Sequence, residues 1–160
     1  MIKTQYACCF TGHRIIATEI QKTLPQKLDN KIRGLIGKGI CDFICGGALG
    51  FDTLAAQTIL KLREEFEHIR LILALPCKNQ TRGWDDEDIE IYNQILKKAD
   101  FVYYTSETYT TGCMMKRNRF MVDNSVACVF LLTNQRSGTY KTVEYALESG
   151  KELHNILVEQ

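Results

Sequence analysis

The sequence has no surplus of charge of either sign, because 20 lysines and arginines stand against 19 aspartates and glutamates, a formal net charge of +1. Proteins that bind nucleic acid without sequence preference usually carry a cationic surplus that displaces counterions from phosphates. Nucleic acid is therefore not an expected partner, although a small basic pocket is compatible with a neutral total.

Long hydrophobic runs are also missing. No uncharged apolar run approaches the ~18 residues that a membrane span needs, and residues 1–6 contain no signal-peptide core. Hydrophobic residues make up 45% and charged residues 24% of the chain, which is typical of a folded protein. We expect a cytoplasmic protein without membrane contact, folded as a single domain over residues 1–160.

Paired-cysteine motifs are absent as well. The seven cysteines include no CxxC, and no histidine stands at a zinc-like spacing from Cys41 and Cys45. An odd number of cysteines cannot all pair within one chain, so reduced cysteines in a cytoplasm are the favoured interpretation. A structural disulfide or zinc site is the alternative. We expect no metal and no cofactor.

What the sequence does contain is an alternation of short apolar runs and amphipathic stretches. Continuous apolar runs are typical of strands buried on both faces of a sheet. The predicted strands cover 6–10, 42–45, 69–75, 101–104, 126–132 and 153–158, and the predicted helices cover 18–38, 50–65, 84–98, 113–124 and 139–149. The alternation predicts an α/β fold, a Rossmann-like three-layer α/β/α architecture with a mostly parallel sheet of about six strands. Pro25 indicates that the first helix begins near Leu24.

Ligands of open α/β sheets bind beyond the C-terminal ends of the strands, and Thr11, Gly12, His13 and Arg14 follow the first strand. Gly12 permits a tight exit, while His13 and Arg14 offer one titratable and one permanent cation. The alternative is that both side chains belong to an ordinary solvated loop.

A glycine-rich turn follows the second strand and contains Gly46, Gly47, Ala48 and Gly50, with Asp52 at the start of the next helix. Glycines let backbone N–H groups approach a phosphate at a helix N-terminus, so the turn is a candidate phosphate-binding loop. It matches neither the dinucleotide fingerprint nor the Walker loop. Asp52 either caps the helix or accepts a ribose hydroxyl.

Two later residues offer base and phosphate contacts. Trp84 could stack on a base, or it anchors its helix to the body of the protein. Arg117 shares a helical face with Met114 and Met121. An arginine on a packing face predicts a clamp for phosphate or carboxylate, and its neighbour Asn118 belongs to the same candidate site.

The last candidate turn follows the fifth strand. Ser137 and Thr139 can cap the helix that begins there, and Gly138 leaves room for a phosphate at its N-terminus. Glu144 lies more than a turn further along. It is either a general base or ribose ligand, or an ordinary exposed carboxylate, and spacing alone favours the latter.

Together these segments resemble the SLOG superfamily of Rossmann-like proteins and, within it, the small YpsA-like family. The resemblance runs in order over nearly the whole chain. The segments that carry it are Thr11-Gly12-His13-Arg14, Gly46-Gly47-Ala48-Leu49-Gly50-Phe51-Asp52, Trp84, Tyr92, Ala99-Asp100, Gly112-Cys113-Met114, Arg117-Asn118-Arg119-Phe120-Met121-Val122-Asp123 and Ser137-Gly138-Thr139.

Two related families indicate the ligand class. Residues 46–52 and 117–119 are similar to segments of the DprA proteins, which use this fold to bind single-stranded DNA. Residues 114–121 and 137–139 are similar to segments of the LOG phosphoribohydrolases, which cleave the N-glycosidic bond of nucleoside monophosphates with an arginine and a glutamate. That resemblance gives Arg117 the place of the arginine. Residues 140–142 are not acidic, as the LOG pattern requires, and the first glutamate after them is Glu144.

The favoured hypothesis is a sensor or regulatory domain that binds a nucleotide or nucleotide-derived phosphorylated ligand at the C-terminal ends of the strands. The alternative is a hydrolase or transferase of the N-glycosidic bond, for which Arg117, Glu144 and Asp52 would be catalytic. A single-stranded nucleic-acid-binding module of the DprA kind is a further alternative. Dimerisation is common among proteins of this fold, so a homodimer is an expected assembly.

Overall fold

The computed structural model describes residues 1–158 and contains a single sheet of six strands in the order β4-β3-β2-β1-β5-β6. All neighbouring strands are parallel. The strands are β1 (Ala7–Gly12), β2 (Asp42–Cys45), β3 (Arg70–Leu75), β4 (Phe101–Tyr104), β5 (Ala127–Leu131) and β6 (Glu152–Asn155). The helices are α1 (Thr18–Gly37), α2 (Phe51–Arg63), α3 (Asp86–Lys98), α4 (Cys113–Asp123) and α5 (Gly138–Glu148), with a short 3-10 turn at Thr4–Tyr6.

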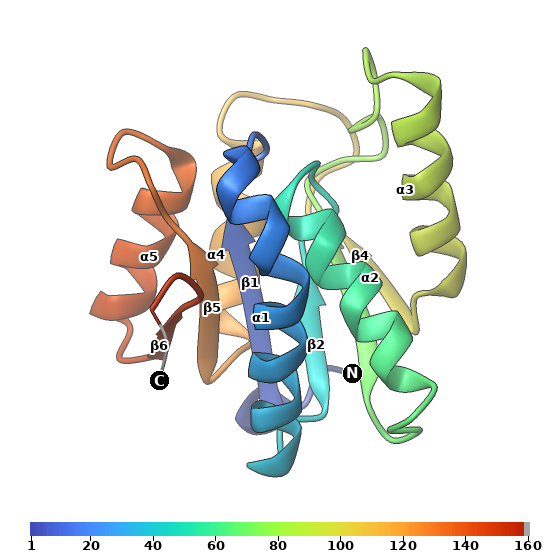
Figure 1. Cartoon of the computed structure of the whole chain (residues 1–160). Helices are drawn as coiled ribbons and strands as arrows, with labels where there is room; N and C mark the ends of the chain where they lie inside the picture. Colours follow the sequence, from blue (N-terminus) through green and yellow to red (C-terminus); the bar gives the residue numbers. More distant parts are fainter. Residues whose placement is uncertain (159–160) are drawn as a thin grey trace.

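Helices cover both faces of the sheet (Figure 1). One hydrophobic cluster joins the sheet to α1, α2 and α3, and a second joins it to α4 and α5. In β1, Cys8 and Phe10 face the first cluster, whereas Ala7 and Cys9 face the second, as the alternation of side chains along a strand requires. The predicted three-layer α/β/α architecture with a parallel sheet is therefore confirmed.

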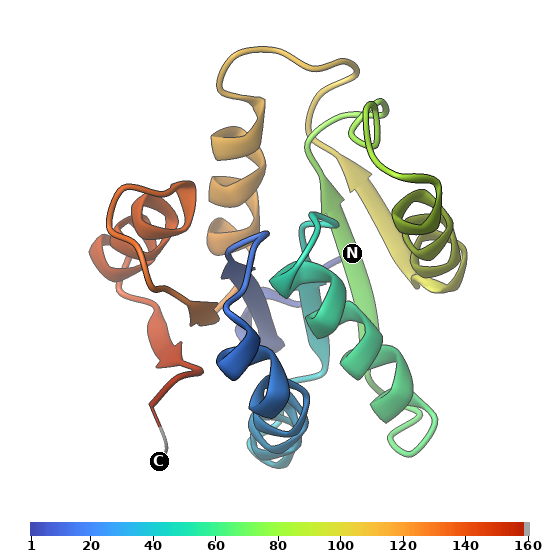
Figure 2. The ribbon, with the colours of Figure 1, turned by 45° about the horizontal axis from the view of Figure 1, so that its top comes forward.

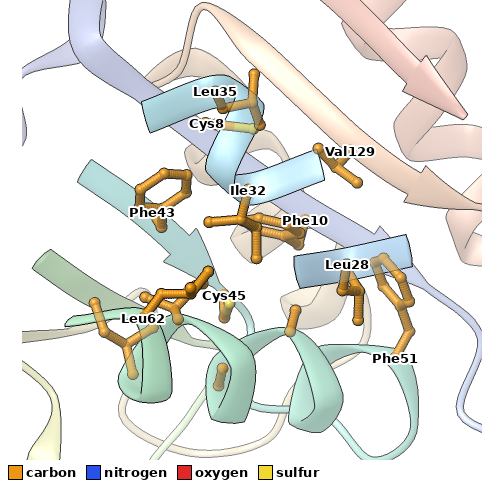
Figure 3. Packing of buried hydrophobic residues seen from close by; sticks show 14 of the residues in the cluster. Cys8, Phe10, Leu28, Ile32, Leu35, Phe43, Cys45, Phe51, Leu62 and Val129 are labelled. Carbon is orange, nitrogen blue, oxygen red and sulfur yellow. The ribbon is translucent and has the colours of Figure 1, made fainter. Parts of the chain in front are cut away.

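The larger cluster lies between the sheet and helices α1 and α2 (Figure 3). The ring of Phe10 on β1 lies 6.2 Å from that of Phe43 on β2 and 6.4 Å from that of Phe51 on α2. Leu28 and Ile32 of α1 are fully buried in the same cluster. Apolar packing of this kind fixes the start of α2 and the end of β1 relative to each other.

Element boundaries differ from the prediction at two places. Helix α1 begins at Thr18 and includes Pro25 in its interior, so the prediction of a start near Leu24 is wrong. The loss of one backbone donor at Pro25 is outweighed by the buried apolar face of the helix. Strand β6 ends at Asn155 rather than 158, because Leu157 N and Val158 N both donate back to Asn155 in a turn. The last two residues of the predicted 1–160 domain lie outside the described residues.

A buried carboxylate fixes the other end of the sheet, where the strands begin. Asp42, the first residue of β2, accepts two hydrogen bonds of 2.7 Å from Arg70 of β3. Its Oδ2 also accepts a hydrogen bond of 2.8 Å from Lys3 N. Burial raises the pKa of Asp42, but the hydrogen bonds from Arg70 and Lys3 outweigh it and hold this pKa below its usual value.

No helix within residues 1–158 is long and apolar enough to cross a membrane. All seven cysteines are free thiols. Within the same residues, no group of three or more His, Cys, Asp or Glu side chains is arranged to hold a metal ion.

Candidate functional site

A cavity of about 270 Å³ lies at the C-terminal ends of the strands, where the chain leaves β1 and where α5 begins after β5. Because strand order runs outward from β1 to β4 and then returns to β5 on the other side of β1, this is the point at which ligands bind in open parallel sheets. The cavity is lined by Thr11, Gly12, His13, Arg14, Ala48, Asp52, Met114, Arg117, Asn118, Ser137, Gly138 and Thr139. All of them except Met114 belong to the ligand site predicted from the sequence.

Arg117 of α4 is almost completely buried and fixes the base of the cavity. Its Nη1 donates to the carbonyl oxygens of Gly46, after β2, and Ala74, in β3, and its Nε donates to Asn118 Oδ1 at 2.8 Å. Burial lowers the pKa of Arg117, and the negative charge of Asp52 counteracts this effect. Most of the guanidinium is therefore used in holding α4 against the ends of two strands.

Asp52, in the first turn of α2, is the buried carboxylate of the cavity. Its Oδ2 accepts a hydrogen bond of 3.2 Å from Ala48 N, in the glycine-rich turn. Burial raises the pKa of Asp52 to about 6, although the charges of Arg117 and Arg14 and the Ala48 hydrogen bond lower it in part. The carboxyl group thus changes charge close to neutral pH.

His13 and Arg14 lie in the loop after β1 and differ in their availability. The Nε2 of His13 accepts a hydrogen bond of 2.9 Å from Thr133 N, so the ring carries its proton on Nδ1, and burial lowers its pKa. The Arg14 side chain is exposed at the cavity. Its guanidinium makes no hydrogen bond or ion pair with any other of the described residues. Arg14 is therefore the cation that an incoming anion can reach.

The N-terminus of α5 forms the opposite wall. Ser137 Oγ accepts a hydrogen bond of 3.2 Å from Tyr140 N and donates one of 2.8 Å to Asn134 O. Gly138 and Thr139 are the first two residues of the helix, and both line the cavity. The first N–H groups of a helix have no partner within the helix and attract anions.

The remaining predicted glycines do not line the cavity but pack behind it. A Cβ atom on Gly46 would lie 2.6 Å from Arg117 Nη1, and one on Gly50 would lie 2.3 Å from Arg14 O. Gly47, with a φ of +71°, packs against Leu75. The glycine-rich turn therefore positions Arg14 and Arg117, and a direct contact of its glycines with phosphate stays a prediction.

Two other predicted residues lie outside the cavity lining. The half-buried Trp84 packs edge-on against Tyr92 of α3, with ring centroids 5.5 Å apart at 88°. Glu144 is exposed on α5. The residue that the sequence missed, Met114, lies one helical turn before Arg117, and this i, i+3 spacing is the signal that identifies it.

A family model described as "YspA SLOG family" matches residues 9–160. The uncharacterized SPbeta prophage-derived protein YoqJ of Bacillus subtilis is 32% identical over 116 residues, which cover 65% of this chain and 68% of that protein. The UPF0398 protein BH1768 of Halalkalibacterium halodurans is 30% identical over 143 residues, covering 88% of this chain and 71% of that protein.

Two solved structures of DNA processing protein A (DprA) share the fold. The Streptococcus pneumoniae protein superposes with a TM-score of 0.66 at 19% sequence identity. The superposition covers 93% of this chain and 49% of that protein. The Helicobacter pylori protein, whose structure describes its single-stranded DNA binding mode, has a TM-score of 0.67 at 19% identity. The superposition covers 94% of this chain and 64% of that protein.

The expectation that nucleic acid is not a partner, drawn from the net charge, is wrong. Two fold neighbours are DprA proteins, and the H. pylori member binds single-stranded DNA. Net charge sums over the whole surface, so it does not detect cations that gather at one place. In this chain, Arg14 and Arg117 lie at the same small cavity.

Proposed function

The chain belongs to the YspA SLOG family, and we propose that its cavity binds a phosphate group of single-stranded nucleic acid. The observation that carries this proposal is the convergence of the Arg14 side chain with the N-terminus of α5. Both features attract anions, and within residues 1–158 no carboxylate forms a salt bridge with the Arg14 guanidinium, although its charge acts on Asp52.

The binding chemistry follows from the groups that line the cavity. The planar guanidinium of Arg14 can donate two directed hydrogen bonds to phosphate oxygens. The N–H groups at the start of α5 and the side-chain amide of Asn118 add donors on other sides. A volume of about 270 Å³ suits a phosphate with its sugar rather than several nucleotides. A strand would therefore lie across the opening with one phosphate inserted.

A free nucleotide or nucleotide-derived ligand is the second candidate. It uses the same phosphate chemistry, and it is favoured by the small cavity and by a formal net charge of only +1. N-glycosidic cleavage has less support. Of its two predicted carboxylates, Asp52 lines the cavity, but Glu144 is exposed on α5 and does not.

Fluorescence anisotropy with a labelled oligothymidylate of about 16 nucleotides tests the proposal. We expect binding to the single strand, weaker binding to a duplex of the same length, and competition by an unlabelled strand at far lower concentration than by AMP. If AMP competes as well as the strand on a molar basis, the free-nucleotide function replaces the proposed one. If neither ligand binds, both functions are excluded.

A further inference from the structure

The loops that follow β3 and β4 lie side by side at the same edge of the sheet as the cavity. Thr105 N donates to Leu75 O at 3.0 Å, and Lys78 N donates to Glu107 O at 3.1 Å. Tyr109 N donates to Asn79 Oδ1 at 3.1 Å. These bonds fix the segment 105–109 to the loop after β3. Figure 2 shows how the chain then crosses from β4 to α4, whose first turn reaches the cavity.

Two tyrosine rings are exposed here, one at the end of β4 and one on the segment 105–109. Tyr104, at the end of β4, is 40% exposed and Tyr109 is 63% exposed. The ammonium group of Lys78 lies 5.7 Å from the centre of the Tyr104 ring and 3.0 Å from Glu107 Oε2. By contrast, Trp84, the residue expected to stack on a base, already packs against Tyr92.

Single-stranded nucleic-acid-binding proteins combine exposed aromatic rings, on which bases stack, with cations that contact the backbone. Because Lys78 is already paired with Glu107, the cation that serves the backbone here is Arg14 in the cavity. Tyr109 precedes the cavity residue Met114 by five positions, so the two lie at most about 18 Å apart. The turn in which Cys113 N donates to Thr110 O brings them closer. A strand with one phosphate in the cavity can reach the rings within a few nucleotides.

We propose that Tyr104 and Tyr109 form a platform on which bases of a single strand stack while a phosphate of the same strand occupies the Arg14 cavity. The inference rests on the proposed function. It assigns the base contacts to the segment before α4. That segment contains none of the motifs that define the cavity.

Oligothymidylate binding by Tyr104→Ala and Tyr109→Ala tests this platform. Loss of one stacked base lowers affinity by roughly 5- to 150-fold, so each variant should bind more weakly by a factor in this range. Tyr109→Phe keeps the ring and should bind as the wild type does. The matched control is Tyr6→Ala, which removes a ring that is 46% exposed just before β1, at the opposite edge of the sheet.

A second arm replaces individual nucleotides of the strand by abasic sites. At the position that stacks on Tyr109, the abasic strand should bind the wild type as weakly as the intact strand binds Tyr109→Ala, and combining the two changes should add nothing further. Affinity for inorganic phosphate should be the same in wild type and tyrosine variants, because phosphate contacts only the cavity.

The outcomes separate the platform from the cavity. If both alanine variants bind the strand as the wild type does while Arg14→Ala does not, the platform is wrong and the proposed function stands. An equal loss of phosphate affinity in the tyrosine variants would show that they distort the cavity, and this also overturns the platform. If the wild type binds no strand, both proposals fail. Dissociation of a dimer by Tyr109→Ala without any change in strand affinity would assign the rings to contact between copies of this chain.

Discussion

At the scale of single residues, two arginines that the sequence places in one candidate site have different surroundings. Arg117 is buried and donates to carbonyl oxygens at the ends of β2 and β3. Arg14 is exposed and forms no hydrogen bond or salt bridge with the described residues, although its charge acts on Asp52. A sequence pattern identifies both cations but not the carbonyl groups around one of them, because these come from segments far apart in the chain.

The first prediction concerns Arg14. Arg14→Ala should lower affinity for single-stranded oligonucleotide about tenfold or more, because it removes charge-assisted hydrogen bonds. Its melting temperature should stay at the wild-type value. Lys38→Ala, which removes a positive charge just after the far end of α1, is the matched control and should bind normally. Normal binding by Arg14→Ala would place the phosphate elsewhere.

Replacement of Arg117, unlike replacement of Arg14, should lower the stability of the protein. Arg117→Ala leaves two buried carbonyl oxygens without their donor, so unfolding free energy should fall by roughly 2–4 kcal/mol. Urea denaturation monitored by circular dichroism measures this loss. Stability equal to that of the wild type would show that these contacts do not hold α4 against the sheet.

Asp52 gives the cavity a pH dependence. Because its pKa is about 6 in the folded protein, acidification from about pH 7.5 to pH 5 protonates it and removes negative charge close to the bound phosphate. Affinity for the single-stranded oligonucleotide should therefore rise as the pH falls. The measurement uses oligonucleotides that lack a terminal phosphate. The cavity also contains the guanidinium groups of Arg14 and Arg117 and the imidazole of His13, whose pKa is lowered by burial.

Asp52→Asn is the control for this titration. It should bind the strand tightly throughout and with little pH dependence, because the amide resembles the protonated acid. A wild-type pH profile that the variant reproduces would assign the titration to another group. The raised pKa also means that Asp52 stabilises the fold below about pH 4, and that this contribution is lost as the pH rises to about 6.

At the scale of elements, the loop that carries Arg14 is seated by two glycines. A Cβ atom on Gly12 would lie 2.4 Å from the ring of Phe51, so only glycine lets the end of β1 approach α2 this closely. Gly50 has a φ of +77° and touches the backbone of Arg14, while Phe51 N donates to His13 O at 3.1 Å. The start of α2 thereby determines where Arg14 lies.

Gly50→Ala should consequently destabilise the protein. The new methyl group would clash with Arg14 O and would require a left-handed backbone, so we expect a loss of roughly 2–4 kcal/mol in urea denaturation. Gly34→Ala is the matched control. It lies in α1 with nothing near its added methyl group, and it should stabilise by about 0.5–1 kcal/mol.

The hydrogen bonds at the start of β2 produce a second pH dependence, in stability. Because the pKa of Asp42 is lowered in the folded state, its contribution is present above about pH 4, the unfolded value, and is lost as the pH falls through the folded value. Asp42→Asn should reduce stability by about 1–3 kcal/mol at neutral pH. The difference from the wild type should shrink on acidification, and a constant difference would contradict this assignment.

At the scale of the whole molecule, the order of the β-strands creates the cavity, and the low net charge limits the attraction of the remaining surface for nucleic acid. The chain crosses from one side of β1 to the other between β4 and β5, which separates the loops after β1 and β5 and leaves room for a ligand. With a formal net charge of +1, the rest of the surface adds little attraction for a long polyanion.

Salt dependence tests this balance of charge. If two or three cations contact phosphates, the logarithm of strand affinity should fall against the logarithm of salt concentration with a slope of about −1.4 to −2.1. Arg14→Ala should make this slope shallower by about 0.7. A much steeper wild-type slope would indicate a wider cationic surface than this cavity.

The sequence by itself determined the layered α/β architecture and nearly every residue that lines the cavity, because strand burial and helix starts leave local patterns, and the ends of parallel strands meet at one edge. Tertiary structure alone decided the roles of those residues. The positions of Gly46 and Ala74 carbonyls make Arg117 a structural donor and leave Arg14 for a ligand. The exposure of Tyr104 and Tyr109 likewise depends on β4 being an edge strand and on bonds between distant loops, which no local pattern encodes.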